Sequence, residues 1–205
     1  MENDRFQKCF RHIFWFTGIV VMYDVQNMEL FNLCKVTLDE AVHIEEITRK
    51  QSKSDHWIKQ RQNRITSSKF GDIIKRKAPV NESLINRIWP RTSVTTASMK
   101  MGLDNEEKAV EKYLMDNPTY KAFTCGVCIN PGIPFLASTP DRLIYDTETE
   151  QCHLLEIKTL VKGGLTLKQT VRECIQDKSA PFLEVTRENE IRLKENHGHY
   201  MQIQA

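Results

Sequence analysis

Two of the carboxylates and the one lysine in the stretch STPDRLIYDTETEQCHLLEIK, residues 138–158, have a spacing that could do chemistry. Asp141 is predicted to end one strand of a hairpin, and Glu156 and Lys158 occupy positions i and i+2 of the next strand. Alternate residues of a strand project to one face, so Glu156 and Lys158 are predicted to share a face. Carboxylate oxygens suit Mg²⁺, which activates a bound water, and an ammonium can stabilise an oxyanion. This pattern predicts metal-assisted hydrolysis, although exposed strands carry the same spacing.

The elements that must position these groups are predicted from hydrophobic period and capping residues. Helices are predicted over 37–50, 54–61, 66–75, 81–89 and 93–115, with Thr37 as an N-cap. Strands are predicted over 123–129, 135–137, 143–145 and 152–159. A helix over 166–178, with Val171, Cys174 and Ile175 inward, a hairpin turning at 187–189 and the opening turns of a helix over 197–205 follow. Residues 1–35 show no clean period and are predicted to be a poorly anchored appendage.

The helix over 93–115 places Glu106 on one face with Ala109 and Tyr113, pointing inward. A glycine inside a helix costs about 1 kcal/mol relative to alanine, so Gly102 suggests a close approach to the backbone there. A helix that starts instead at Asp104 is an alternative, and it leaves Glu106 on the same side.

Basic charge is concentrated in residues 49–77. That stretch holds ten Lys or Arg against two Asp, a net charge of +8, whereas the whole chain carries only +2. Trp57 and Phe70 stand among these basic residues. A basic segment beside an acidic remainder is typical of a protein that holds a phosphate backbone, and a solvated helix face is the alternative.

Four sequence blocks resemble, in order, the YqaJ viral recombinase and lambda exonuclease branch of the PD-(D/E)XK nucleases. WIKQRQNRITSS, residues 57–68, is similar to the family's W-x3-R-x6-S segment. MGLDNEEKAVEKY, residues 101–113, resembles its G-x3-E-x2-A helix. STPD and LEIK resemble the nuclease core, and HGHYMQIQ, residues 197–204, resembles an H-x-Y-Y-x-Q-x-Q helix with His199 in place of the first Tyr. These blocks cover about residues 40–205.

The resemblance implies roles for residues at the matching positions. The metal ligands it implies are Asp141, Glu156, Glu106 and the carbonyl of Ile157. The catalytic residues are these three carboxylates together with Lys158, the catalytic lysine, and Gln202, which reaches the active site. It implies that Arg61 and Ser68 contact phosphates near the 5′ end of the substrate. The expected DNA contacts are Arg61, Arg64, Ser68, Lys69, Thr139 and Arg142.

Two departures from the family pattern bear on these roles. Arg142 stands where relatives commonly have Gly, so it is strained if the turn needs a positive φ, and it could instead meet DNA. Family members continue the Gln helix and add at least one strand, so the chain is expected to be truncated at its C-terminus. The resemblance thus implies an α/β fold with a restriction endonuclease-like core, a central mixed β-sheet flanked by helices and an N-terminal helical segment, in a nuclease domain over residues 36–205.

The resemblance implies a Mg²⁺-dependent deoxyribonuclease, in which Mn²⁺ can replace Mg²⁺. Such an enzyme hydrolyses linear DNA as an exonuclease. The process it implies is DNA recombination or repair of viral or mobile-element type. The implied partner is double-stranded DNA with 5′-phosphorylated ends, and a homo-oligomer is compatible because ring trimers occur among relatives. The alternative is an inactive DNA-binding module with the same fold. The longest apolar run, residues 13–23, is too short to span a membrane, so an intracellular location is expected.

The cysteines are expected to be reduced. Cys125 and Cys128 form a CxxC pair, for which zinc binding and redox chemistry are the functional alternatives. Since no second ligand pair is evident, we predict that they are buried strand thiols.

Overall fold

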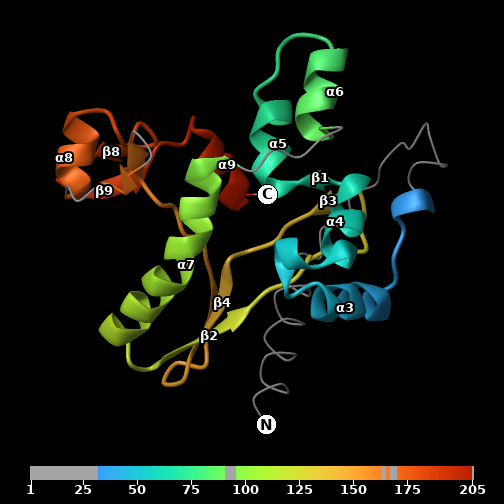
Figure 1. The fold of residues 1–205 in the computed structure, drawn as a ribbon, viewed down its shortest axis with the longest axis horizontal. Helices are drawn as coiled ribbons and strands as arrows, with labels where there is room; N and C mark the ends of the chain where they lie inside the picture. Colours follow the sequence, from blue (N-terminus) through green and yellow to red (C-terminus); the bar gives the residue numbers. More distant parts are fainter. Residues whose placement is uncertain (1–31, 91–95, 163–164, 167–169, 205) are drawn as a thin grey trace. The chain divides into compact units, whose positions relative to one another are not determined.

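The computed structural model describes residues 32–90, 96–162, 165–166 and 170–204 of the chain. These residues form an α/β fold, as predicted, with several small sheets (Figure 1). The chain divides into two compact units. The first holds the described residues up to Thr66 together with Leu114–Glu156, and the second holds those of Ser67–Tyr113 and from Ile157 onward. The predicted appendage over 1–35 lies outside the described residues except for 32–35.

The first unit combines short helical segments with the strands of two sheets. Among these segments are α3 (Leu38–Ile47), the 3₁₀ helix η1 (Gln51–Lys53) and α4 (Asp55–Gln62). Its strands are β1 (Ile65–Thr66), β2 (Tyr120–Thr124), β3 (Leu136–Ala137), β4 (Arg142–Asp146) and β5 (Cys152–Leu155). β1 pairs in parallel with β3, and β2, β4 and β5 form an antiparallel sheet with β4 at its centre.

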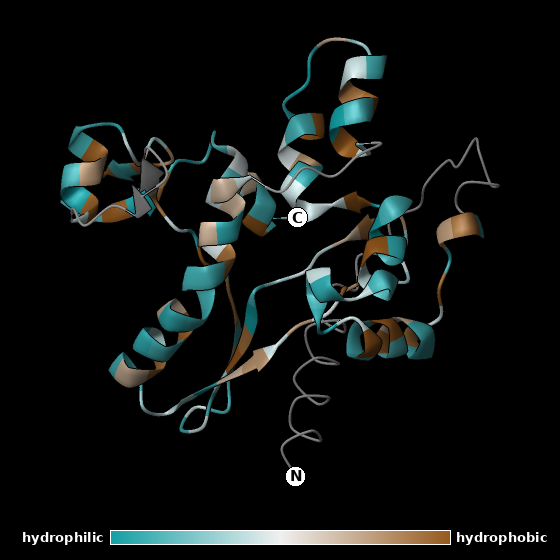
Figure 2. Ribbon diagram, viewed as in Figure 1, coloured by the Kyte–Doolittle hydropathy of each residue, from teal (hydrophilic) through white to brown (hydrophobic). Residues whose placement is uncertain are grey.

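α3 begins where the sequence predicts. The Thr37 side chain accepts a hydrogen bond from the Glu40 amide, and the Glu40 carboxylate accepts one from the Thr37 amide, which completes a capping box. Hydrophobic and hydrophilic residues alternate around the helix (Figure 2). Its buried face carries Ala41, Ile44 and also Glu45, and Ile44 packs into one core cluster with Val127, Ile129 and Ala137.

The second unit is mainly helical. Its elements are α5 (Ser67–Ile74), α6 (Glu82–Ile88), most of α7 (Ala97–Asp116), β6 (Val161–Lys162), β7 (Leu165–Thr166), α8 (Val171–Gln176), β8 (Leu183–Val185), β9 (Ile191–Leu193) and α9 (Gly198–Gln204). β8 and β9 form the predicted hairpin. α5 packs against α9, where a Cβ built at Gly71 would lie 3.4 Å from the Gly198 Cα. None of the helices among the described residues combines the length and apolar character that membrane crossing requires.

Several predicted boundaries are wrong. The helix predicted over 93–115 is α7, which begins at Ala97, so only the alternative start at Asp104 is wrong; residues 91–95 lie outside the described part. The strand predicted over 123–129 is instead β2, which ends at Thr124. It stops there because the amides of Gly126 and Val127 donate to the side chains of Glu45 and Thr48, not to a neighbouring strand.

Other expectations also change in detail. Val171, predicted to point inward, is exposed, while Cys174 is buried. No described atom lies within 4 Å of a Cβ built at Gly102, so the described chain makes no close approach there. Cys34, Cys125, Cys128 and Cys174 are free thiols, as predicted, but Cys152 is disulfide-bonded, so the prediction of a reduced thiol is wrong there.

Candidate active site

Asp141 and Glu156 flank the open end of the β4–β5 hairpin. The last registered pair of the ladder is Arg142 with Leu155, and Asp141 and Glu156 each lie one residue beyond it. The two residues therefore lie at the same end of two neighbouring strands, each next to the last paired residue of its strand. Both residues are partly buried. The first unit thus brings two carboxylates to one strand end.

The predicted relation between Glu156 and Lys158 is wrong. The sequence pattern extends the strand to residue 159, whereas β5 ends at Leu155. The partner strand explains this end, because Pro140 has no N–H with which to extend the ladder. Strand alternation therefore does not relate Lys158 to Glu156.

Each residue from Ser138 to Asp141 is tied in place by hydrogen bonds. Ser138 and Cys128 exchange two backbone hydrogen bonds of 3.0 and 2.8 Å. The Thr139 hydroxyl oxygen accepts from the Trp57 indole at 3.3 Å and from the Arg61 guanidinium at 3.1 Å.

The next two carbonyls of this segment are held by side chains as well. The Gln51 amide donates to the Pro140 carbonyl at 3.3 Å, and the Arg142 guanidinium donates to the Asp141 carbonyl at 2.6 Å. Side chains from η1, α4 and β4 therefore converge on the segment that carries Asp141.

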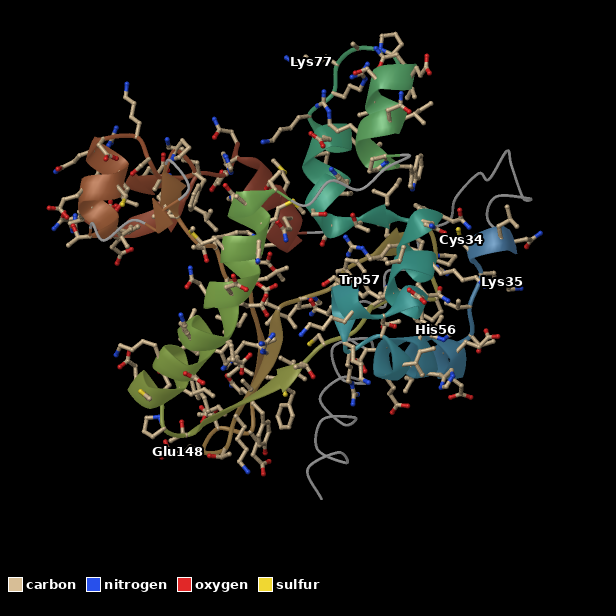
Figure 3. All side chains as sticks on the ribbon, in the orientation of Figure 1. Cys34, Lys35, His56, Trp57, Lys77 and Glu148 are labelled. Atoms are coloured by element: carbon tan, nitrogen blue, oxygen red, sulfur yellow. The ribbon has the colours of Figure 1, made fainter. Side chains whose placement is uncertain are left out.

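Arg61 is a partly buried cation. Its guanidinium carbon lies 4.1 Å from the centroid of the Trp57 ring, on α4, where Figure 3 labels Trp57. Burial lowers the pKa of Arg61 to about 10, because the charged form loses hydration. Among the described residues no carboxylate forms an ion pair with it. Arg61 therefore combines a partly buried positive charge with a hydrogen bond to the Thr139 hydroxyl.

Arg64 and Arg142, expected to contact DNA, are instead buried in the first unit. Arg64 is 6% exposed, and its guanidinium donates to the carbonyls of Pro134, Gln60 and Cys34. Arg142 is 8% exposed in β4 and has no positive φ, so the strain predicted at this position is absent. Burial and these bonds show that both residues help to hold the fold, and their contact with DNA stays a prediction.

The other expected site residues lie in the second unit. Ser68, exposed, and Lys69, partly buried, occupy the first turn of α5. Glu106 on α7 and Gln202 on α9 are partly buried, Ile157 is partly buried and Lys158 is exposed. Lys77, the last residue of the basic segment, follows α5 (Figure 3).

The positive charge of Lys158 acts on His199 of α9. The pKa of His199 is lowered first by burial, then by the positive charge of Lys158 and by His197. Its ring packs against those of Phe182 and His197, with centroids 4.9 and 4.7 Å away. Since Lys158 acts electrostatically on His199, the second unit places the expected catalytic lysine near the helix that carries Gln202.

The donor set around Asp141 suits a hard divalent cation. Two carboxylates at one strand end, with the carbonyl of Ile157 next in sequence, are all-oxygen ligands of the kind Mg²⁺ takes together with water and phosphate oxygens. Among the described residues no three His, Cys, Asp or Glu side chains form a complete metal-binding group. A protein often supplies only one or two carboxylates to Mg²⁺, and water completes the coordination. The Asp141 and Glu156 pair therefore fits a partly hydrated ion.

The CxxC pair does not offer such a site. Cys125 and Cys128 are free thiols whose pKa values are raised by burial, that of Cys125 to about 12. A protonated thiol is a poor metal ligand and nucleophile. The prediction of buried strand thiols is met only in part, because Cys125 is buried but lies outside a strand, whereas Cys128 is partly buried and forms an isolated bridge with Ser138.

Sequence reasoning missed Gln51 and gave Trp57 no role of its own. Gln51 contacts a residue 89 positions away, and no motif marks it. A tryptophan four residues before an arginine on one helix could have indicated the stacked pair, because residues i and i+4 are neighbours on a helix surface.

Comparisons with known proteins find one family and two solved structures to which this chain is similar. The sequence profile of the YqaJ-like viral recombinase domain matches residues 56–181. A crystal structure of LHK-Exo in complex with dAMP is 20% identical, with a TM-score of 0.49 over 74% of this chain and 66% of that one.

A crystal structure of the same alkaline exonuclease, from Laribacter hongkongensis, is 24% identical, with a TM-score of 0.44 over 61% of this chain and 60% of that one. The chain thus spans less than two thirds of the length of either structure. No curated protein matches the sequence.

Proposed function

The chain belongs to the YqaJ-like viral recombinase domain family, and from this premise we propose that it is a metal-dependent DNA exonuclease that hydrolyses phosphodiester bonds of linear DNA. The observation that supports the proposal is that Asp141 and Glu156 each lie one residue beyond the last registered pair of β4 and β5. Two carboxylates held this way can bind a divalent cation and a substrate phosphate together. The nuclease domain spans residues 36–205 and acts in recombination or repair of viral or mobile-element type.

The metal is Mg²⁺, for which Mn²⁺ substitutes, and when bound it lowers the pKa of a water and neutralises charge that develops on the phosphate. Asp141 and Glu156 hold it. The family motifs add Glu106 and the Ile157 carbonyl as further ligands, Lys158 as the ammonium that stabilises the transition state, and Gln202 as a residue that orients the reacting groups.

Arg61, Thr139, Ser68 and Lys69 bind the phosphates of double-stranded DNA, and Arg61 with Thr139 receives the 5′ phosphate. The Thr139 oxygen accepts hydrogen bonds from both Trp57 and Arg61, which leaves the hydroxyl hydrogen to be donated to a third partner. A phosphate oxygen beside Arg61 accepts it and supplies the negative charge that the Arg61 site lacks.

A cleavage assay on linear double-stranded DNA with Mg²⁺ tests this function. The substrates carry either a 5′ phosphate or a 5′ hydroxyl, and a closed circular duplex reports endonuclease activity. We expect wild-type protein to degrade the phosphorylated linear DNA, and Asp141→Asn, Glu156→Gln and Lys158→Ala each to lower the rate roughly 100-fold or more. Glu148→Ala removes an exposed carboxylate from the turn of the same hairpin (Figure 3) and is the matched control.

Full activity in Asp141→Asn and Glu156→Gln would contradict this assignment of the site. Salt-sensitive DNA binding with no Mg²⁺-dependent cleavage would instead favour a DNA-binding module that keeps the fold.

A further inference from the structure

Gln51 adopts a backbone conformation that its residue type disfavours. It opens the 3₁₀ helix between α3 and α4 with a φ of 48°, in the left-handed region. Residues with a Cβ adopt this region mainly where the surrounding structure compels them to, and such positions cluster at functional sites. Gln51 lies outside residues 56–181, the part that matches the family profile. A reason for its conformation must therefore be sought in its contacts.

Both amide hydrogens of Gln51 are used on one part of the chain. Nε2 donates to the Cys125 carbonyl at 3.0 Å and to the Pro140 carbonyl at 3.3 Å. The two acceptors are 74 and 89 residues away in sequence. Since an amide NH₂ group has two hydrogens, Gln51 joins the loop after β2 to the peptide immediately before Asp141 with no donor left over.

The peptide on the other side of Asp141 is held as well, through the bond from Arg142 to the Asp141 carbonyl. The Pro140 ring fixes its own φ. Gln51 therefore restrains a remaining degree of freedom, the rotation of the peptide plane between Pro140 and Asp141. A rotation of that plane would swing the Asp141 side chain away from Glu156.

We propose that Gln51 is a positioning residue for Asp141. It holds the Pro140 carbonyl so that the Asp141 carboxylate stays at the same strand end as Glu156. This inference rests on the proposed nuclease function, since it assigns Gln51 to the geometry of the metal site and not to the fold alone.

Two substitutions at Gln51 and one control distinguish the effect of its side chain from the effect of its backbone conformation. Gln51→Glu keeps the length but replaces the donor with a carboxylate that faces two carbonyls. Gln51→Gly also removes the donor, but it adopts a positive φ without strain, so it protects against a failure to fold. Ser52→Ala changes the exposed neighbour in the same 3₁₀ helix and is the matched control.

The experiment measures four quantities for each variant. They are kcat and KM on linear duplex DNA with Mg²⁺, the affinity for Mn²⁺ by calorimetry without DNA, hydrogen exchange in residues 138–145, and the midpoint of unfolding. We expect Gln51→Glu and Gln51→Gly to lower kcat and the Mn²⁺ affinity about 10- to 100-fold, as for other groups that orient metal ligands. KM should stay within about 2-fold, and exchange in 138–145 should become faster. Ser52→Ala should match wild type.

Either of two results would overturn the inference. One is wild-type kcat and Mn²⁺ affinity in Gln51→Gly and Gln51→Glu. The other is a loss of kcat that the metal site does not explain. That is a lower kcat with unchanged Mn²⁺ affinity and unchanged exchange in residues 138–145, or a lower kcat that is accounted for by a lower unfolding midpoint. Failure of the nuclease function itself is distinguishable, because wild type would then not cleave DNA, while the Mn²⁺ and exchange measurements would still test Gln51.

Discussion

The two units tie their chain segments together by different means. In the first unit, polar side chains reach across the sequence into sites that are buried or partly buried, as Glu45 does to the Gly126 amide and Arg64 to the Pro134 carbonyl. In the second unit, side-chain bonds between strands or helices lie at exposed sites, such as that of Arg192 to Glu184, and α5 meets α9 at glycines. The first unit thus adds buried polar bonds between distant segments to its hydrophobic core clusters.

This difference has energetic consequences. A hydrogen bond at an exposed site is replaced by water when a partner is removed, so its loss costs a few tenths of a kcal/mol up to about 1 kcal/mol. A buried acceptor left without its donor costs about 1–3 kcal/mol, because no water reaches it. Substitutions of similar size should therefore destabilise the first unit more than the second.

Gly126→Ala is expected to have the largest effect. A Cβ at Gly126 would lie 1.9 Å from the Glu45 carbonyl oxygen and 2.4 Å from the Thr48 hydroxyl, so the loop and α3 would have to separate. We expect a loss of about 3 kcal/mol or more in the free energy of unfolding, measured by urea titration.

Gly198→Ala in α9 is the matched control for this comparison, since no atom of the described chain lies within 4 Å of its added Cβ. It should change stability by less than about 1 kcal/mol. Equal losses in the two variants would contradict the contrast between the units.

Arg64→Ala should follow in size. It removes a buried guanidinium that serves three carbonyl acceptors, so we expect the free energy of unfolding to fall by about 2–3 kcal/mol. The same variant should leave the salt dependence of DNA binding unchanged at temperatures where it is folded, because the Arg64 side chain is buried. A reduced salt slope for Arg64→Ala would restore the original expectation that this residue contacts phosphates.

Helix starts and the position of the two candidate carboxylates beside a hairpin could be predicted from the sequence, because local chemistry marks them. Thr37 with Glu40, and Asn81 at the start of α6, are capping residues that act within one turn. Asp141 and Glu156 were predicted as a pair because they flank a hairpin whose strands and polar turn are readable.

Features that depend on distant partners could not be predicted. The apolar run 123–129 resembles a strand, yet the Gly126 and Val127 amides bond to α3, which no local pattern reveals. The roles of Gln51 and Arg64 depend on acceptors 70 to 89 residues away. The end of β5 at Leu155 likewise follows from Pro140 on the partner strand.

Arg61→Gln tests a contrast between two arginines of the first unit, because Arg61 lacks the carbonyl partners of Arg64. We expect DNA affinity to fall about 10-fold and the slope of log affinity against log salt to decrease by about one, since one phosphate contact is lost. The free energy of unfolding should change by less than about 1 kcal/mol. Arg61→Gln loses the stacking on Trp57, but it also removes a charge that burial disfavours, and the two effects offset each other. Binding titrations of catalytically inactive Asp141→Asn protein, with and without Arg61→Gln, measure both quantities. An unchanged salt slope would exclude Arg61 as a phosphate ligand.

The smallest expected effect is a pH dependence in the second unit. The pKa values of His199 and His197 are lowered in the folded chain, first by burial. The folded state therefore binds fewer protons than the unfolded state, so stability is present above the ordinary histidine pKa of about 6.5 and is lost as pH falls below it. His199→Tyr removes one such group, and the drop in Tm between pH 7.5 and pH 5.5 should shrink by roughly 2 °C.

His56→Tyr is the control for His199→Tyr, because His56 is exposed on α4 in the other unit. It should leave the pH dependence as in wild type. An equal drop in Tm in wild type and His199→Tyr would mean that His199 is hydrated enough to be protonated at no cost. The contribution of His199 to the second unit would then come from its ring contacts with Phe182 and His197, and water would screen it from the charge of Lys158.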